Sequence, residues 1–238
     1  MKIFLTDISD MNDDIMNKGL KLVPAYRKDK IERYRFMEDK ERSLAAGLLL
    51  NYATKLYSIY MSYAGEIELK TASDDIFNVK LDELVKSYDT SYDYNIEYAG
   101  NGKPVYSGLD TYFNLSHAGT CVVCAVSDRA VGIDIERPRQ NAIKVAERFF
   151  TQAECDWIGD DSLRFARIWT LKEAYAKLTG DGIAGTVSKV EFRHETAANM
   201  ASVVNMYISG KKADNIKIYE LNIIKQKYVI SAMEYIEN

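Results

Sequence analysis

The chain has 238 residues, of which 47% are hydrophobic and 28% are charged. This length suits one large domain or two small ones, and the composition excludes a disordered or collagen-like chain. The 31 basic and 35 acidic side chains give a net charge of −4. Nucleic-acid binding depends mainly on a basic surface that neutralises phosphates, so this balance argues against a nucleic-acid partner. An anionic ligand would need a local group of basic residues.

The N-terminal residues and the cysteines predict a cytoplasmic protein without a membrane partner. Residues 1–7 contain a short apolar run that predicts a first strand and lacks the apolar core of a signal peptide. The longest apolar stretch, 44–50, is too short to span a membrane. Cys121 and Cys124 have the C-x-x-C spacing but lie in an apolar run, so we expect buried thiols and no metal or redox site.

The segment 27–63 predicts a helix that is broken near 37–39, because its apolar residues recur at three-to-four-residue spacing. Basic residues outnumber acidic ones within 21–42. This stretch is therefore the most favourable place in the first half for an anionic ligand.

The segment 71–98 is acidic and rich in tyrosine. It predicts a helix over 76–88 followed by an exposed edge or loop, and no function is assigned to it. The Gly-Asn-Gly-Lys-Pro sequence at 100–104 is the clearest turn, and it divides the chain near its middle.

After this turn the chain predicts short strands and fewer helices. Thr151 and Glu154 form a capping-box pattern, and Gly180 suits a helix C-terminus. Helices and strands in both halves, without strict alternation, predict an α+β fold with two similar-sized lobes, each a small mainly antiparallel sheet packed with helices. The predicted strands cover 112–116, 121–127, 130–136, 187–192, 201–208, 215–224 and 227–235, and the predicted helices cover 142–150 and 162–178.

Asp134 and Glu136 are the strongest local sign of chemistry. They lie two residues apart in a predicted strand, so both point to one face at a spacing of roughly 6.6 Å, while Val131, Ile133 and Ile135 point to the other. Paired carboxylates suit a hard cation such as Mg²⁺. A solvated acidic strand face is an equally good interpretation of this hexapeptide alone.

Trp169, Glu173 and Lys177 form one stripe on a predicted helix at i, i+4 and i+8. Taken alone, Glu173 and Lys177 are a surface ion pair. Together with the two strand carboxylates, Glu173 completes a set of three acidic ligands and leaves a lysine beside it. Lys172 is one position off this stripe, and its role stays open.

Ser116 and His117 stand where a predicted strand gives way to a turn, and the serine hydroxyl is a possible phosphate contact. A serine hydrolase is disfavoured, because no Gly-x-Ser-x-Gly sequence surrounds Ser116 and an adjacent Ser-His pair is the wrong arrangement for a triad. The second histidine, His194, has charged neighbours and is expected at the surface.

The motifs at 102–104, 114–117, 131–136 and 169–177, in this order, resemble the motif series of the 4′-phosphopantetheinyl transferases. The length and the N-terminal half resemble the long, two-lobed Sfp-type branch of that superfamily. This resemblance implies that a serine of an apo acyl or peptidyl carrier protein attacks the β-phosphorus of coenzyme A. The 4′-phosphopantetheine group is then installed, and adenosine 3′,5′-bisphosphate is released.

The resemblance also implies which residues act. Asp134, Glu136 and Glu173 would hold Mg²⁺, with Mn²⁺ as a possible substitute, and Asp134, Glu173 and Lys177 would be catalytic. Whether Glu173 is a base, a ligand or both stays open. The residues implied for coenzyme A and its 3′-phosphate are Arg27, Lys30, Arg42, Ser43, Lys103, Ser116, His117 and Lys177.

The resemblance implies that the two lobes contribute different parts of the active site. Residues 1–110 would form the lobe on the 3′-phosphate and adenosine side, and 111–238 would carry the metal carboxylates and the catalytic helix. The active site would lie in a cleft between the two lobes of one chain, so a monomer is expected.

Two other functions stay open at this point. The same carboxylates suit a metal-dependent hydrolase of nucleotide pyrophosphates, and the chain also suits a non-catalytic module that binds coenzyme A. The sequence does not reveal which carrier protein is served.

Overall fold

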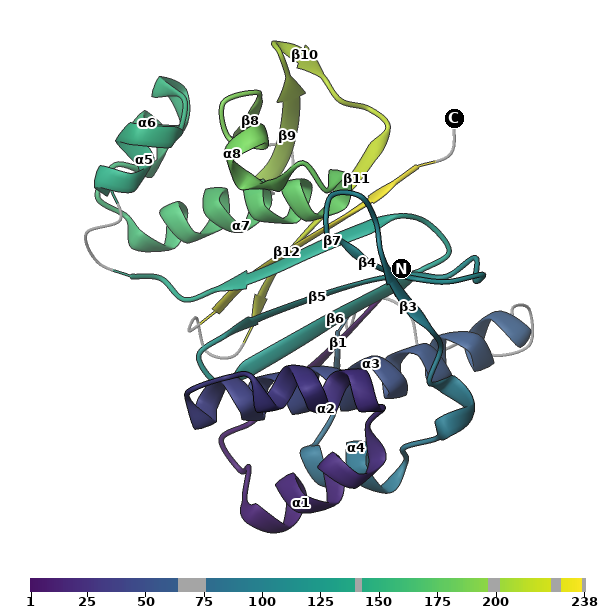
Figure 1. The fold of residues 1–238 in the computed structure, drawn as a ribbon. Helices are drawn as coiled ribbons and strands as arrows, with labels where there is room; N and C mark the ends of the chain where they lie inside the picture. The colour runs from purple at the N-terminus through teal and green to yellow at the C-terminus, as the bar shows by residue number, and fades with distance from the viewer. Residues whose placement is uncertain (64–75, 140–142, 197–201, 224–227, 237–238) are drawn as a thin grey trace. The chain divides into compact units, whose positions relative to one another are not determined.

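The chain forms two compact units, each built from helices and mainly antiparallel sheet (Figure 1). This confirms the predicted α+β class. None of the helices in the described ranges is long and apolar enough to cross a membrane. The computed structural model describes residues 1–63, 76–139, 143–196, 202–223 and 228–236. Unit 1 comprises Met1–Ala99 and Pro104–Arg129, and unit 2 comprises Gly100–Lys103 and Ala130–Asn238.

The division differs from the boundary expected between residues 110 and 111. The two strands over 112–127 group with unit 1, because the second of them pairs with the N-terminal strand over 121–126. The turn residues Gly100–Lys103 group with unit 2.

Unit 1 contains a sheet in which β1 pairs in parallel with β2 and antiparallel with β6, and β6 pairs antiparallel with β5. Every residue of β6 is buried, so Cys121 and Cys124 lie in the core as predicted. The strands of unit 1 are β1 (Lys2–Asp7), β2 (Ile76–Asn78), β3 (Ile96–Tyr98), β4 (Pro104–Tyr106), β5 (Tyr112–Ala118) and β6 (Cys121–Ser127).

The long helix α3 packs against β6 and β1, where Leu44, Leu48 and Leu49 are fully buried (Figure 1). The predicted helical segment breaks at 33–36, slightly earlier than expected, because extended Phe36 begins a new helix. The first helix, which begins at the Asn12 cap, was not predicted. The helices of unit 1 are α1 (Asp13–Leu22), α2 (Ala25–Glu32), α3 (Met37–Ser62), α4 (Leu81–Lys86) and the 3₁₀ turn η1 (Thr90–Tyr92).

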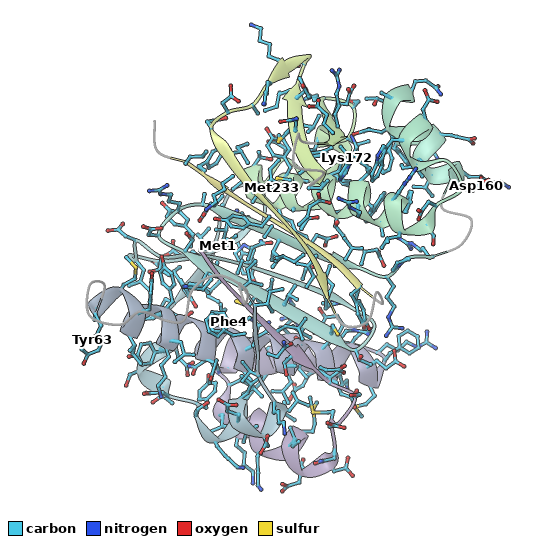
Figure 2. All side chains as sticks on the ribbon, turned by 180° about the vertical axis from the view of Figure 1, so that it is seen from behind. Met1, Phe4, Tyr63, Asp160, Lys172 and Met233 are labelled. Carbon is cyan, nitrogen blue, oxygen red and sulfur yellow. The ribbon has the colours of Figure 1, made fainter. Side chains whose placement is uncertain are left out.

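The helix predicted over 76–88 is wrong in its first part. Residues 76–78 form β2 beside β1, and Phe77 stacks on Phe4 with ring centroids 5.1 Å apart (Figure 2 labels Phe4). A partner distant in sequence decides this strand, so local periodicity does not reveal it. Residues 71–75 of the tyrosine-rich segment lie outside the described residues.

Unit 2 contains two antiparallel sheets, in the orders β11-β12-β7 and β10-β9-β8. The capping box at Thr151 and Glu154 is confirmed, as is the left-handed Gly180 that ends α7. Its elements are β7 (Val131–Glu136), α5 (Ile143–Phe149), α6 (Gln152–Ile158), α7 (Ser162–Thr179), α8 (Gly182–Thr186), β8 (Val190–Thr196), β9 (Ser202–Ile208), β10 (Lys211–Lys212), β11 (Ile216–Ile223) and β12 (Tyr228–Tyr235).

Six predicted element ends in unit 2, at 130, 150, 178, 187, 192 and 215, differ from the structure by one to four residues, and four others cannot be compared. The strand predicted from 187 begins at 190, because the unpredicted helix α8 and a turn precede it. The helix predicted to 178 continues to 179. The predicted element ends at Ala142, Ala201, Ile224 and Lys227 lie outside the described residues.

His194 is buried, which corrects its expected surface position. Its side chain is 2% exposed, and its ring stacks on Trp157 with centroids 3.9 Å apart. The Nε2 atom lies 3.2 Å from Glu220 Oε2. The charged neighbours in sequence gave no sign of Trp157 and Glu220, which come from distant elements.

Helix α7 lies along β7 and β12 (Figure 1). The backbones of α7 and β7 approach each other at Gly132. A Cβ atom at this position would stand 2.0 Å from the Ala174 carbonyl oxygen and 2.5 Å from the Leu178 nitrogen. Both atoms belong to the backbone, so no side chain fits between strand and helix. The glycine at position 132 therefore allows close backbone contact between the two elements that carry the predicted carboxylates.

Gly132→Ala should lower the free energy of unfolding by about 2–3 kcal/mol or more, because the added methyl group forces α7 away from β7. Urea denaturation measures this loss. The matched control is Gly100→Ala, where a Cβ meets no atom within 4 Å and should change stability by less than about 1 kcal/mol. Equal stability of the two variants would contradict the close contact.

Candidate active site

Asp134 and Lys177 meet where β7 faces α7. The Lys177 Nζ donates to Asp134 Oδ1 at 2.6 Å and to the Ile133 carbonyl oxygen at 3.2 Å. Asp134 is only 6% exposed. The interpretation of this strand face as merely acidic and solvated is therefore wrong for Asp134, whose carboxylate is buried against a cation.

Glu136 lies at the end of β7 and is more exposed than Asp134. Its Oε1 accepts the Arg137 backbone N–H at 2.9 Å, and its Oε2 lies 3.1 Å from Arg139 Nη2. The sequence did not lead us to predict a role for Arg139. Its position three residues after Glu136, in a polar segment, could have indicated this ion pair. A basic side chain thus already balances this carboxylate.

Glu173 projects from α7 and is half-buried. Burial raises the pKa of its carboxyl group, and the negative charges of Asp134 and Glu136 raise it further, against the opposing effect of Lys177. The charges of both strand carboxylates therefore act on Glu173. Additional positive charge beside Glu173 would lower the cost of keeping it ionised.

Asp134, Glu136 and Glu173 have the ligand chemistry of a divalent-cation site. No group of three acidic, histidine or cysteine side chains within the described ranges is arranged to hold a metal ion. The ligand chemistry nevertheless fits, because carboxylate oxygens suit Mg²⁺ and an ammonium group already lies on Asp134. The charge of a divalent cation would also offset the negative charge of these carboxylates. Asp134, Glu136 and Glu173 therefore stay the predicted ligands.

Arg27 and Lys30 lie on α2 in unit 1. Arg27 is 7% exposed, and its Nε has no hydrogen-bond partner among the described residues. It rests against α3 at Gly47, where a Cβ would stand 3.2 Å from its Cγ and Nε. Burial, and then the charge of Arg27, lower the pKa of Lys30. A bound anion would accept a hydrogen bond from the Arg27 Nε and would oppose the lowering of the Lys30 pKa.

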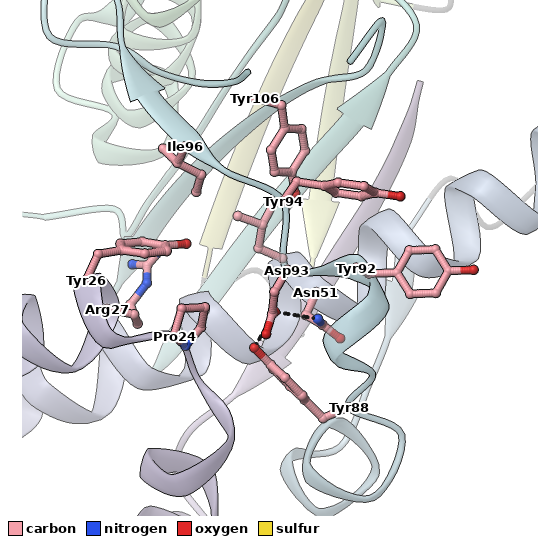
Figure 3. Close-up of a pocket in the computed structure, with 12 residues that line it drawn as sticks. Pro24, Tyr26, Arg27, Asn51, Tyr88, Tyr92, Asp93, Tyr94, Ile96 and Tyr106 are labelled. Carbon is pink, nitrogen blue, oxygen red and sulfur yellow. Dashed lines mark hydrogen bonds between the residues drawn. The ribbon is translucent and has the colours of Figure 1, made fainter. Parts of the chain in front are cut away.

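The tyrosine-rich segment contributes to the wall of a small pocket beside Arg27 (Figure 3). Tyr88, Tyr92 and Tyr94 all line this pocket. Asp93 holds the segment on α3, because its Oδ1 accepts from Tyr88 Oη at 2.5 Å and from the Asn51 side chain at 2.9 Å. The segment without an assigned function therefore forms part of the surroundings of Arg27.

Arg42, on α3, bonds to the turn that follows β5. Its Nη1 donates to the Gly119 carbonyl oxygen at 3.0 Å, and its Nη2 contacts Asp39 Oδ1 at 2.7 Å. Ser43 is buried beside it. Ser116 and His117 lie on β5, partly buried and exposed respectively.

The coenzyme A residues implied by the sequence divide between the units. Lys103 and Lys177 belong to unit 2, and the others belong to unit 1. Lys103 Nζ donates to the Val131 carbonyl oxygen at 3.0 Å and to the Leu178 carbonyl oxygen at 3.1 Å. Burial lowers its pKa to about 8. Within unit 2, this lysine therefore bonds to both β7 and α7.

Lys172, which is labelled in Figure 2, has a buried partner that the sequence did not reveal. Its Nζ lies 3.0 Å from Glu154 Oε2 and donates to the carbonyl oxygens of Val187 and Val190 at 3.0 and 2.5 Å. Both side chains of the ion pair are fully buried. Lys172 therefore joins α7 to α6 and to the start of β8, which answers the question left open about its role.

Comparison with known proteins gives one family and several relatives. The sequence pattern of the 4′-phosphopantetheinyl transferase superfamily matches residues 130–232. The chain is 30% identical over 203 residues to the 4′-phosphopantetheinyl transferase psf-1 of Bacillus pumilus, which covers 81% of this chain and 75% of that protein.

Two further relatives match shorter stretches. The 4′-phosphopantetheinyl transferase gsp of Aneurinibacillus migulanus is 34% identical over 129 residues, 52% of this chain and 50% of that protein. The 4′-phosphopantetheinyl transferase Sfp of Bacillus subtilis strain 168 is 36% identical over 89 residues, 35% of this chain and 40% of that protein.

Lys172→Met should destabilise the protein by about 3–5 kcal/mol, because it leaves the Glu154 carboxylate buried without its cation. Thermal or urea unfolding measures the loss. The double variant Lys172→Met/Glu154→Gln removes both charges and should recover part of it. A double variant no more stable than the single one would contradict this account of the buried pair.

Proposed function

This chain belongs to the 4′-phosphopantetheinyl transferase superfamily, and we propose that it transfers the 4′-phosphopantetheine group of coenzyme A to a serine of an apo carrier protein. The products are the holo carrier protein and adenosine 3′,5′-bisphosphate. The cofactor is Mg²⁺, which Mn²⁺ could replace, and the partner is an acyl or peptidyl carrier protein.

The observation that carries this proposal is the contact of Lys177 with Asp134, with Glu173 in the same electrostatic group. The Lys177 ammonium can contact a pyrophosphate directly. The carboxylates on the facing elements can hold a divalent cation that contacts the pyrophosphate as well. When bound, Mg²⁺ neutralises charge on the pyrophosphate as the leaving phosphate departs. Asp134, Glu136 and Glu173 would hold it.

The reaction exchanges one phosphorus–oxygen bond for another. The carrier serine oxygen bonds to the β-phosphorus, and the bond from this phosphorus to the bridging oxygen breaks. Glu173, directly or through water, accepts the serine proton; burial and its acidic neighbours raise its pKa and so increase its basicity. Lys177 stabilises the negative charge that develops on the departing bisphosphate, or gives it a proton.

We assign the 3′-phosphate of coenzyme A to unit 1, with Arg27 and Lys30 as its main cations. The buried Nε of Arg27 lacks a partner among the described residues, and the pKa of Lys30 is lowered by burial and then by its cationic neighbour. A phosphate would satisfy both groups at once. Arg42, Ser43, Ser116 and His117 complete the proposed set.

We also propose a cytoplasmic monomer. The metal carboxylates and the unit 1 cations are all on one chain, so a second copy is not needed to supply either set. The buried thiols of Cys121 and Cys124 suit a reducing compartment. Sedimentation equilibrium at assay concentration should give the mass of a single chain, and a dimer mass would contradict the proposed monomer.

The purified protein, with coenzyme A and Mg²⁺, should add the phosphopantetheine mass to an apo carrier protein, as measured by intact-mass spectrometry. Asp134→Asn should lower the rate at least about 100-fold, because it weakens cation binding at the reacting phosphates. Circular dichroism should show that this variant is folded.

The control reaction omits the carrier. Coenzyme A consumed at the same rate without carrier would instead indicate a pyrophosphate hydrolase. Coenzyme A binding without mass gain on several unrelated apo carriers would indicate a non-catalytic binding module. Either result would overturn the proposed transferase.

A further inference from the structure

The turn at Gly100–Lys103 packs on the end of helix α7, although the sequence motif around Lys103 implied a phosphate ligand. We infer that Lys103, together with Asn101, is a positioning residue that holds the last turn of α7 against β7 and does not bind the 3′-phosphate of coenzyme A. This inference rests on the transferase function proposed above.

Lys103 joins one carbonyl of each element. Val131, whose carbonyl oxygen it bonds at 3.0 Å, is the first residue of β7, and Leu178, bonded at 3.1 Å, lies in the last turn of α7. The final four carbonyls of a helix have no partner within the helix, and the negative end of its dipole favours a cation there. The ammonium meets both needs.

The Asn101 side chain lies against the same end of α7, at Gly180. A Cβ atom at Gly180 would stand 1.8 Å from Asn101 Nδ2, so the asparagine side chain fills the space that glycine leaves. Asn101 Oδ1 also accepts the Lys103 backbone N–H at 3.1 Å, which orders the turn itself. Asn101 and Lys103 therefore act as one clasp on the end of α7.

The two residues whose carbonyls Lys103 bonds lie next to residues of the candidate active site in sequence. Leu178 directly follows Lys177, and Val131 precedes Gly132, the point of backbone contact between β7 and α7. If the last turn of α7 loosens, Lys177 loses its fixed position relative to Asp134. The ammonium of Lys103 is partly buried and donates to two carbonyls, whereas Arg27 in unit 1 has a donor without a described partner.

The test compares coenzyme A with 3′-dephospho-coenzyme A as substrates. Lys103→Met should lower kcat about tenfold or more with both substrates, so the ratio of their kcat/KM values stays as in the wild type. Lys30→Met, which removes a proposed phosphate cation, should move this ratio toward one. Lys86→Met replaces an exposed surface lysine and should behave as the wild type.

The outcomes separate the two roles of Lys103. A substrate ratio that falls toward one in Lys103→Met, as in Lys30→Met, would show a phosphate ligand and overturn the inference. An unchanged kcat would overturn it as well. If Lys103→Met does not fold, Asn101→Ala weakens the same clasp and should show the same uniform loss of kcat, with an altered substrate ratio again contradicting the inference.

Hydrogen exchange tests the clasp even if the proposed transferase activity is absent. The Gly180 N–H, which donates to the Ala176 carbonyl oxygen at 2.8 Å, should exchange at least about tenfold faster in Lys103→Met than in the wild type. Lys103→Arg keeps a cationic donor at this position and should restore part of the protection. Unchanged exchange at Gly180 would overturn the inference independently of any assay.

Discussion

The backbone contact between β7 and α7 at Gly132 is the constraint on which unit 2 depends. Because no side chain intervenes there, the helix lies close enough to the strand for Lys177 to contact Asp134. The charges of the two strand carboxylates also raise the pKa of Glu173. A larger residue would separate the two elements and with them the acidic and basic groups. One glycine thus connects the packing of the unit with the chemistry that we propose for it.

Two lysines hold α7 at different points, Lys172 fully buried and Lys103 partly buried. Lys172 connects the middle of the helix to α6 through Glu154, to the end of α8 through the Val187 carbonyl and to the start of β8 through the Val190 carbonyl. Lys103 connects the end of the helix to β7. Both ammonium groups carry a cost of burial, and in both the pKa is lowered for that reason. Lys177, in contrast, keeps some exposure at the carboxylates, where a substrate phosphate can reach it.

Local signals in the sequence predicted most of the elements around the site. The alternation in β7, the capping box at Thr151 and the glycine after α7 each act within a few residues, so the sequence alone located them. Features that need a distant partner were not predictable in the same way. The strand β2 depends on β1, the burial of His194 depends on Trp157, and the bonds of Lys103 depend on carbonyls that carry no sequence signal.

We propose that the β7–α7 contact places Asp134, Glu136 and Glu173 so that they hold one divalent cation at the pyrophosphate. Anomalous diffraction from crystals grown with Mn²⁺ and coenzyme A tests it most directly. The account predicts one manganese peak within bonding distance of the carboxylates of Asp134, Glu136 and Glu173. Ordered coenzyme A with no manganese at these carboxylates, or manganese bound at another site, would contradict it.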